Sequence, residues 1–185
     1  MKKKSLLWIS ALLLMLAGCS SSDNDENDNN PLFSNDYLIL SNTLQISNDG
    51  NADIGNYAVT NNKFYIDKMP VLENNCPGFI FHCDIKEYPY LRELIIRIIG
   101  SKPDIDAFQV GETFQLDQFN ASLMPIEPCG TTPAQFRATK GIIKLVDKKK
   151  ADDKDILTFQ INNLTFEQGY IVTGAVDFEY EGTVY

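Results

Sequence analysis

The chain is short of the residues on which nucleic-acid binding and membrane spanning depend. Its 185 residues include 16 Lys and Arg against 25 Asp and Glu, a formal net charge of −9. Binding to a phosphate backbone needs a basic surface that displaces counterions, so this balance excludes nucleic acid as a partner. The longest apolar run, at residues 6–17, is shorter than the roughly 20 residues that span a bilayer as a helix.

The residues of catalysis are equally scarce. His82 is the only histidine, and the chain has no G-x-S-x-G motif, whereas nucleophilic catalysis needs a base beside its nucleophile. The acids within residues 104–106 and 152–155 are close sequence neighbours, and the second group lies among lysines. That pattern is typical of a charged hairpin tip, not of two carboxylates that face each other across a cleft. We therefore predict a non-catalytic protein that carries no cofactor.

The N-terminus, by contrast, has a well-defined pattern. Basic residues at 2–4 precede the apolar run of residues 6–17, which fits the h-region of a secretory signal. The run closes with the sequence LAGC at residues 16–19, which resembles the bacterial lipobox. The resemblance implies that residues 1–18 are a removed signal peptide and that Cys19 is acylated, for example with palmitate. The alternative is an ordinary secretory signal with an incidental cysteine.

Residues 19–30 form the predicted tether. After Cys19 the sequence is SSSDNDENDNN, with four acids, no base and no apolar residue, so it lacks the apolar surface that would offset the entropy of ordering. The segment resembles the acidic export signal of surface lipoproteins in Bacteroidota. That resemblance implies attachment to the outer membrane through the acylated Cys19, with the domain on the cell surface; a periplasm-facing domain is the alternative.

Residues 31–185 have the pattern of a single all-β domain with 13 basic and 21 acidic side chains. Short runs of alternating polarity are separated by Asn, Asp, Gly and Pro, and the best strand spans residues 172–180. An antiparallel β-sandwich, immunoglobulin-like or jelly-roll-like, is predicted because the stretches at 69–78 and 124–133 suggest crossovers between sheets. A small lipocalin-like β-barrel is the alternative. Further strands are predicted at residues 38–47, 57–60, 63–67, 79–83, 114–116, 135–146, 157–161 and 164–166, the last two forming either one bent strand or two.

Residues 91–99 fit both a helix and a strand. The apolar residues occur at both spacings, but four isoleucines lie between residues 94 and 99, and β-branched side chains favour a pleated surface. We predict a central strand, buried on both faces except at Arg97.

Once Cys19 is acylated, an odd number of cysteines remains. Cys76 and Cys129 lie in turn-forming sequences, so a Cys76–Cys129 disulfide is the favoured prediction, with a Cys76–Cys83 bridge or no bridge as alternatives. Cys83 shares a strand face with two phenylalanines and is predicted to be a buried thiol. A Cys3His zinc site is rejected because His82 and Cys83 point to opposite faces of a strand, and no metal site is predicted.

A weak calcium candidate lies at Asp49, Asn51 and Asp53. Alternate oxygen ligands followed by glycine are typical of calcium loops, but the glycine, Gly55, comes one place late and no acid closes the loop. A plain turn between strands is the preferred interpretation.

Tyr88 and Tyr90 are the weak candidates for ligand binding. They flank Pro89 in a predicted loop, where tyrosine can stack on a sugar, anchor a protein partner or cap the core. We predict a lipid-anchored binding or accessory module for a glycan or a protein. The alternative is a structural or assembly subunit of an outer-membrane complex or pilus.

Overall fold

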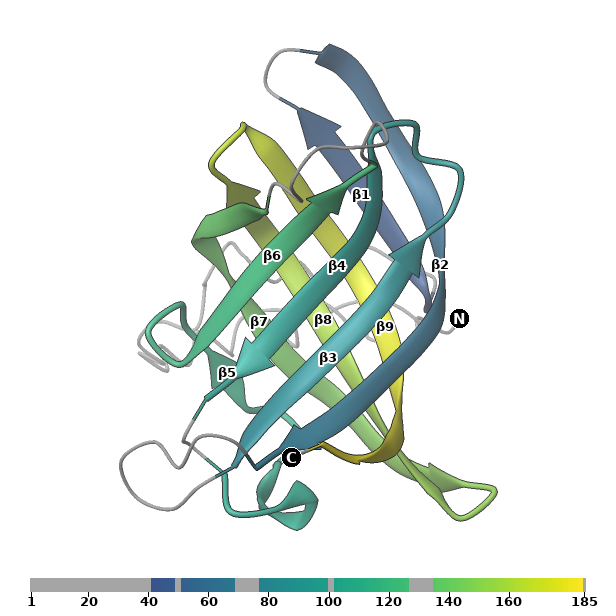
Figure 1. Ribbon diagram of the computed structural model, residues 1–185, viewed down its shortest axis with the longest axis vertical. Coiled ribbons are helices and arrows are strands. Elements are labelled where there is room, and N and C mark those ends of the chain that lie inside the picture. Colours follow the sequence, from purple (N-terminus) through teal and green to yellow (C-terminus); the bar gives the residue numbers. More distant parts are fainter. Residues whose placement is uncertain (1–40, 49–50, 69–76, 100–101, 127–134, 185) are drawn as a thin grey trace, which may run out of the picture. The chain divides into compact units, whose positions relative to one another are not determined.

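The computed structural model describes residues 41–48, 51–68, 77–99, 102–126 and 135–184, and the side chains of residues 51–54 are not among the described parts. These ranges contain nine strands and one 3₁₀ helix (Figure 1). The strands are β1 (Thr43–Asn48), β2 (Asn51–Asp67), β3 (Gly78–Ile85), β4 (Leu91–Ile98), β5 (Thr113–Phe114), β6 (Phe119–Pro125), β7 (Phe136–Ala151), β8 (Lys154–Phe166) and β9 (Tyr170–Val184), and the helix is η1 (Ile105–Ala107).

Eight of these strands close into an antiparallel β-barrel. Each long strand pairs with the next along the chain, in the order β1-β2-β3-β4-β6-β7-β8-β9. The last strand then pairs with the first, with Gly174 opposite Leu44. β5 pairs only with β7. Figure 1 shows the two walls of the barrel, with β3, β4 and β6 in front of β7, β8 and β9.

The predicted β-sandwich is wrong, and the barrel alternative is confirmed. The stretches at 69–78 and 124–133, which were expected to cross between two sheets, connect neighbouring antiparallel strands: β2 pairs with β3, and β6 pairs with β7. Proline-rich connections resemble crossovers in sequence, yet here they join adjacent strands. Within the described ranges the strands therefore form one sheet that closes on itself, and these ranges contain no second sheet to which a connection could cross.

β2 changes its partner half-way along its length. Its first half pairs with β1, and from Lys63 opposite Glu179 onward it pairs in parallel with β9. Asn42 marks the junction, because its Oδ1 accepts hydrogen bonds from Asn62 Nδ2 at 2.8 Å and from the backbone N–H of Asp177 at 2.9 Å. The backbone of Asn42 has a φ of 61°, which asparagine tolerates better than most residues.

The interior of the barrel is filled by side chains. β3 alternates strictly between buried and half-buried positions, as expected of a strand with one face toward a core. Phe81 packs against Phe64, Phe159 and Phe178, with ring centroids 4.9–5.3 Å apart. The core is thus built largely from inward-facing phenylalanines, and rings occupy the centre of the barrel.

Individual elements differ from the prediction in specific ways. Residues 91–99 form a strand, as expected, but β4 buries only one face, because Ile95 is half-buried and Arg97 is exposed on the outer wall. For residues 157–161 and 164–166 the alternative of one bent strand is confirmed: both belong to β8, which contains an irregularity between Ile161 and Leu164. β6 was not predicted. No helix in the described ranges is long and apolar enough to cross a membrane.

Candidate functional site

The two ends of the barrel differ in character. At the end where β3 leads into β4, five aromatic side chains from four parts of the chain meet, and we call this set the aromatic end. Its members are Tyr57, Tyr88, Tyr90, Phe136 and Tyr170. The sequence pointed to two of them, Tyr88 and Tyr90, and the closed barrel adds three more.

Tyr88 is the centre of the aromatic end. Its ring contacts Tyr57 at a centroid distance of 4.6 Å, Tyr90 at 6.0 Å and Tyr170 at 6.4 Å, each nearly edge to face, an arrangement that aromatic pairs prefer. Only 8% of Tyr88 is exposed, and it belongs to the main hydrophobic cluster. Tyr88 therefore caps the core.

Tyr90 has the opposite environment, with 58% of the residue exposed. Its backbone carbonyl accepts a hydrogen bond from the N–H of Ile126 at 2.9 Å, which ties the start of β4 to the end of β6. Ile126 is itself 52% exposed. Pro89, which precedes Tyr90, is exposed and restricts the backbone. Tyr90 is thus a solvent-facing ring on a fixed backbone.

The other three rings are held by strands. Tyr57 lies over Gly55, where an added Cβ would come within 2.3 Å of the tyrosine oxygen. Phe136 at the start of β7 and Tyr170 at the start of β9 are stacked, with centroids 5.7 Å apart and planes inclined by 11°. Sequence reasoning missed all three, although Phe136 and Tyr170 each stand at the first residue of a strand beside an end connection.

The opposite end of the barrel is closed by the segment of residues 102–114, which we call the plug. Phe108 is 2% exposed and packs edge to face on Phe79 at 4.8 Å. Lys102 Nζ lies 5.8 Å from the ring centroids of both Phe108 and Phe114, forms an ion pair with Glu112 and donates a hydrogen bond to the Ala107 carbonyl at 3.2 Å. Cation–ring attraction and these polar contacts fix the plug against the core.

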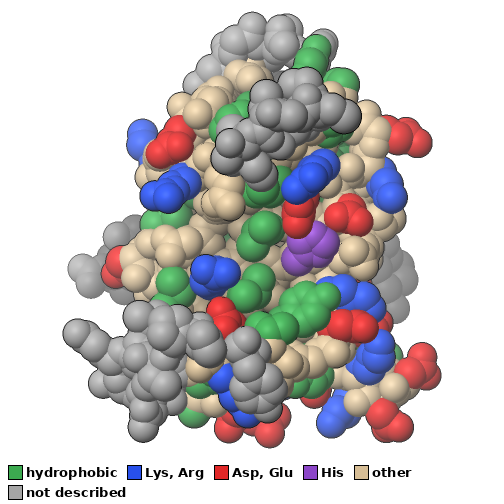
Figure 2. Space-filling model, in the orientation of Figure 1, with side chains coloured by type: hydrophobic (Ala, Val, Ile, Leu, Met, Phe, Trp, Pro, Cys, Tyr) green, Lys and Arg blue, Asp and Glu red, His purple; other side chains and the backbone are tan. Residues whose placement is uncertain are grey.

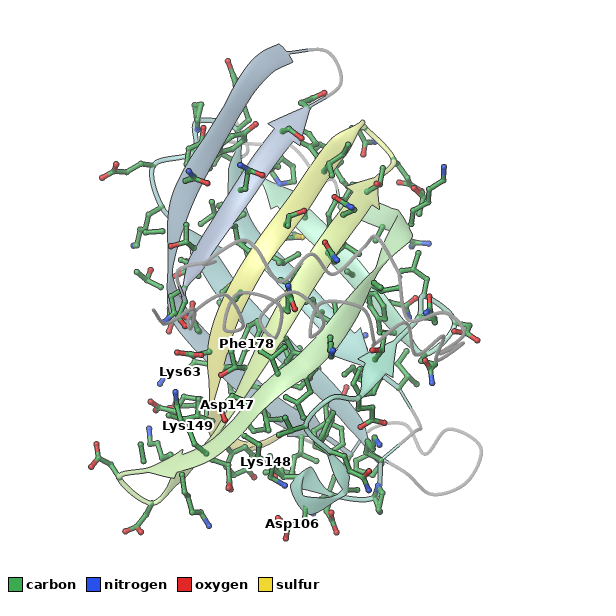
Figure 3. All side chains as sticks on the ribbon, turned by 180° about the vertical axis from the view of Figure 1, so that it is seen from behind. Lys63, Asp106, Asp147, Lys148, Lys149 and Phe178 are labelled. Atoms are coloured by element: carbon green, nitrogen blue, oxygen red, sulfur yellow. The ribbon has the colours of Figure 1, made fainter. Side chains whose placement is uncertain are left out.

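A second lysine holds the plug from β7. Lys148 Nζ donates to the Ile105 carbonyl at 2.9 Å and lies 3.5 Å from an Asp106 carboxylate oxygen (Figure 3). Asp104 accepts a hydrogen bond from the Ala107 N–H at 3.0 Å and caps η1. The carboxylates of Asp104 and Asp106 therefore hold the plug in place, one by capping η1 and the other by pairing with Lys148.

His82 and Cys83 lie on opposite faces of β3, as predicted. The His82 imidazole is on the outer wall, beside acidic side chains in Figure 2, with Nε2 2.7 Å from Glu93 Oε1 and 3.5 Å from Asp84 Oδ1. Cys83 points inward with 0% exposure as a free thiol, and burial raises its pKa. The buried-thiol prediction is confirmed, and the Cys76–Cys83 bridge is wrong.

A network of four charged residues lies on the outer wall where β2 and β9 run in parallel. Lys63 Nζ is 3.1 Å from Glu179 and 2.9 Å from Glu181, and Lys154 of β8 pairs with the same two acids. Hydrogen bonds from Lys154 and then Lys63 lower the pKa of Glu179. The network holds the strands together, and its groups are engaged with one another.

Several predicted sites lie wholly or partly outside the described residues. Cys19, Cys76, Cys129 and Asp49 are outside them. The other calcium candidates, Asn51 and Asp53, have their backbones in β2, where Asn51 pairs with Asn48. Among the residues that the structure does describe, no group of three or more His, Cys, Asp or Glu side chains is arranged to hold a metal ion.

Comparison with known proteins adds no relative from which a function could be transferred. The chain matches no protein-family model, no curated protein and no solved structure. The functional argument therefore depends on the aromatic end itself. Chemically, this end presents one largely exposed aromatic ring, backed by four partly or fully buried rings.

Proposed function

We propose that the protein is a lipid-anchored, non-catalytic binding or accessory module of the outer membrane, and that its aromatic end takes a glycan or a protein. The observation that carries the proposal is the contrast between the two barrel ends. One end is sealed by Phe108 and the plug, whereas the other exposes Tyr90 on a fixed backbone. A fixed aromatic ring binds at low entropic cost, since few rotamers are lost.

The filled interior favours binding at the end of the barrel. An eight-stranded barrel either fills its interior with side chains or holds one small ligand there, and here Phe81, Phe159 and Phe178 occupy the centre. The up-and-down strand order suggests a lipocalin-like barrel in which a ligand is held at the rim instead of within.

A non-catalytic role is consistent with the environment of the reactive side chains. The His82 imidazole is engaged by Glu93 and Asp84 on the outer wall. The Cys83 sulfur is buried, and its raised pKa keeps it in the unreactive thiol form.

The anchor is tested by fractionating cells that produce the full chain or its Cys19→Ala variant. The full chain is expected in the outer-membrane fraction, and Cys19→Ala is expected to be released, because an acyl chain on this residue supplies the membrane affinity. Protease added to intact cells should digest the protein if it faces outward. An unchanged membrane fraction for Cys19→Ala would contradict the anchor.

The binding role is tested by capture from outer-membrane extracts. The lipidated protein in detergent is expected to retain a polysaccharide or a protein, and the double variant Tyr90→Ala/Ile126→Ser is expected to lose it. Equal capture by the unchanged protein and the double variant would exclude the aromatic end as the binding site.

The second candidate, an assembly subunit of an outer-membrane complex or pilus, makes a different prediction about oligomeric state. A binding module of this size is expected to be monomeric in detergent, whereas an assembly subunit should form defined oligomers. Light scattering coupled to size exclusion separates the two.

A further inference from the structure

The exposed part of the aromatic end is small. Tyr90 and Ile126 are its two strongly exposed large hydrophobic residues among those that the structure describes. An exposure of 58% on a tyrosine is on the order of 100 Å², and Ile126 adds a similar area. A stable protein interface buries about 800 Å² on each partner, so the exposed apolar area here is far below that of a protein-docking surface.

A sugar ring, however, needs no more than one aromatic ring. The face of an aromatic ring carries partial negative charge, and one face of a pyranose presents C–H groups with partial positive charge. The Tyr90 ring packs on Tyr88, 6.0 Å away at an angle of 77°, and the hydrogen bond that Ile126 donates to its carbonyl fixes the backbone at this residue.

Polar side chains flank Tyr90 along the chain. Lys86 and Glu87 are exposed in the connection that leads to it, and Glu87 has a φ of 61°, in the turn that reverses the chain. Arg92 follows Tyr90 by two residues, and 55% of its side chain is exposed. These groups supply hydrogen-bond donors and acceptors for hydroxyls at the edge of a stacked sugar.

Charge narrows the ligand class. Next to Tyr90 along the chain, Lys86 and Arg92 are matched by Glu87 and Glu93, so these charges sum to zero, and the excess of acidic side chains in residues 31–185, 21 against 13 basic, disfavours anions. We infer that Tyr90, together with the polar groups of residues 86, 87 and 92, forms a stacking site for a neutral oligosaccharide. This inference depends on the proposed binding function and names its ligand.

The test uses the full lipidated protein in detergent on immobilised oligosaccharides, both neutral (gluco-, manno- and xylo-oligosaccharides) and acidic (uronic-acid oligosaccharides). We expect retention on at least one neutral class, a loss of about tenfold or more in affinity for Tyr90→Ala, and little change for Tyr90→Phe, which keeps the ring. Val110→Ala is the matched control, because Val110 is 59% exposed but lies in the plug, away from the aromatic end. Melting temperatures confirm that each variant is folded.

The possible results separate this inference from the proposed function. Neutral-sugar binding that Tyr90→Ala does not weaken, or binding to acidic sugars alone, overturns the inference. Absence of sugar binding, combined with Tyr90-dependent capture of a protein, overturns the inference but supports the proposed binding function. If the protein neither binds a sugar nor captures a protein through Tyr90, both the inference and the proposed binding function are overturned.

Discussion

At Gly174 the backbones of β1 and β9 come so close that no side chain fits between them. A Cβ added there would lie 2.3 Å from the Thr43 carbonyl oxygen and 2.8 Å from Leu44 Cδ2. Both contacts are far inside van der Waals distance, and the nearer atom is backbone. This glycine therefore permits the strand pairing that closes the barrel.

We expect Gly174→Ala to destabilise the domain by about 1–3 kcal/mol, the usual range for overpacking, and to lower the melting temperature by several degrees. Gly78→Ala is the control, because the nearest atoms there lie at 3.6 Å, an ordinary contact. Thermal denaturation compares the two variants. Equal melting temperatures would show that β1 and β9 are less tightly paired than the structure indicates.

Glu179 makes stability depend on pH. Its pKa is lowered, first by the hydrogen bond from Lys154 and then by the one from Lys63. Because the folded pKa lies below the unfolded one, the stabilisation is present above the ordinary carboxyl range and is lost as the pH falls through the folded pKa. Solvent screens this exposed network, so the effect on stability is small.

An NMR titration of the Glu179 carboxyl tests this directly. In Lys154→Met the pKa of Glu179 is expected to rise toward its ordinary value, because the largest cause of the shift has been removed. Lys149→Met is a control, since Lys149 lies outside the four-residue network and contacts Asp147 and Asp177. An unchanged Glu179 titration in Lys154→Met would contradict the assignment.

The β7–β8 hairpin turns through two consecutive left-handed residues. Asp152 and Asp153 have φ values of 49° and 62°, the pattern of a type I′ turn, whose twist matches that of the flanking strands. Aspartate tolerates this region better than most residues, yet glycine occupies it without strain.

We therefore expect Asp153→Gly to stabilise the hairpin by about 0.5 kcal/mol, which is the relief of strain less the extra entropy that glycine gains when unfolded. Asp147→Gly provides the contrast, because Asp147 lies within β7, where glycine weakens a strand. Melting temperatures should move in opposite directions. A decrease for both would show that the turn is not strained at residue 153.

Local patterns predicted most of the elements. Alternation identified β8 and β9, β-branched residues identified β4, and the acidic turn at 152–153 was expected from the lysines around it. β6 was missed because its sequence, FNASLMP, has a buried Met124 that breaks the alternation. How the strands are arranged could not be predicted, because hairpin lengths look alike in a sandwich and in a closed barrel.

The site was predictable only where its residues are adjacent in the sequence. Tyr88 and Tyr90 stood out because they flank a proline in a connection. Tyr57, Phe136 and Tyr170 are separated by dozens of residues, and only barrel closure brings them to the same end. The difference in burial between Tyr88 and Tyr90 likewise depends on how β3 enters β4.

At the scale of the whole barrel, the favoured disulfide faces a demanding geometry. Gly78, near Cys76, is at the end of the barrel where Phe79 pairs with Ile98. Pro125, near Cys129, pairs with Leu91 at the opposite end. The length of β3, roughly 25 Å, separates the strand ends that lead into the two cysteine-bearing connections.

A Cys76–Cys129 bridge therefore requires the two connections to reach toward each other along the barrel wall, and it stays the prediction from the cysteine pattern. Peptide mapping under non-reducing conditions is expected to recover the two cysteines in one linked pair, with Cys83 protected from alkylation until the protein is unfolded. Recovery of Cys129 as an alkylated free thiol would exclude the bridge.

The pairing of the last strand with the first also determines when the barrel can close relative to synthesis and export. β9 carries hydrogen bonds to β8, β1 and β2, so the wall stays open until the final strand has been synthesised. Contacts between such distant segments form late and slowly. Under the proposed export route, a chain threaded through a translocon stays unclosed until β9 has emerged, so a signal at its beginning can be recognised before any barrel forms.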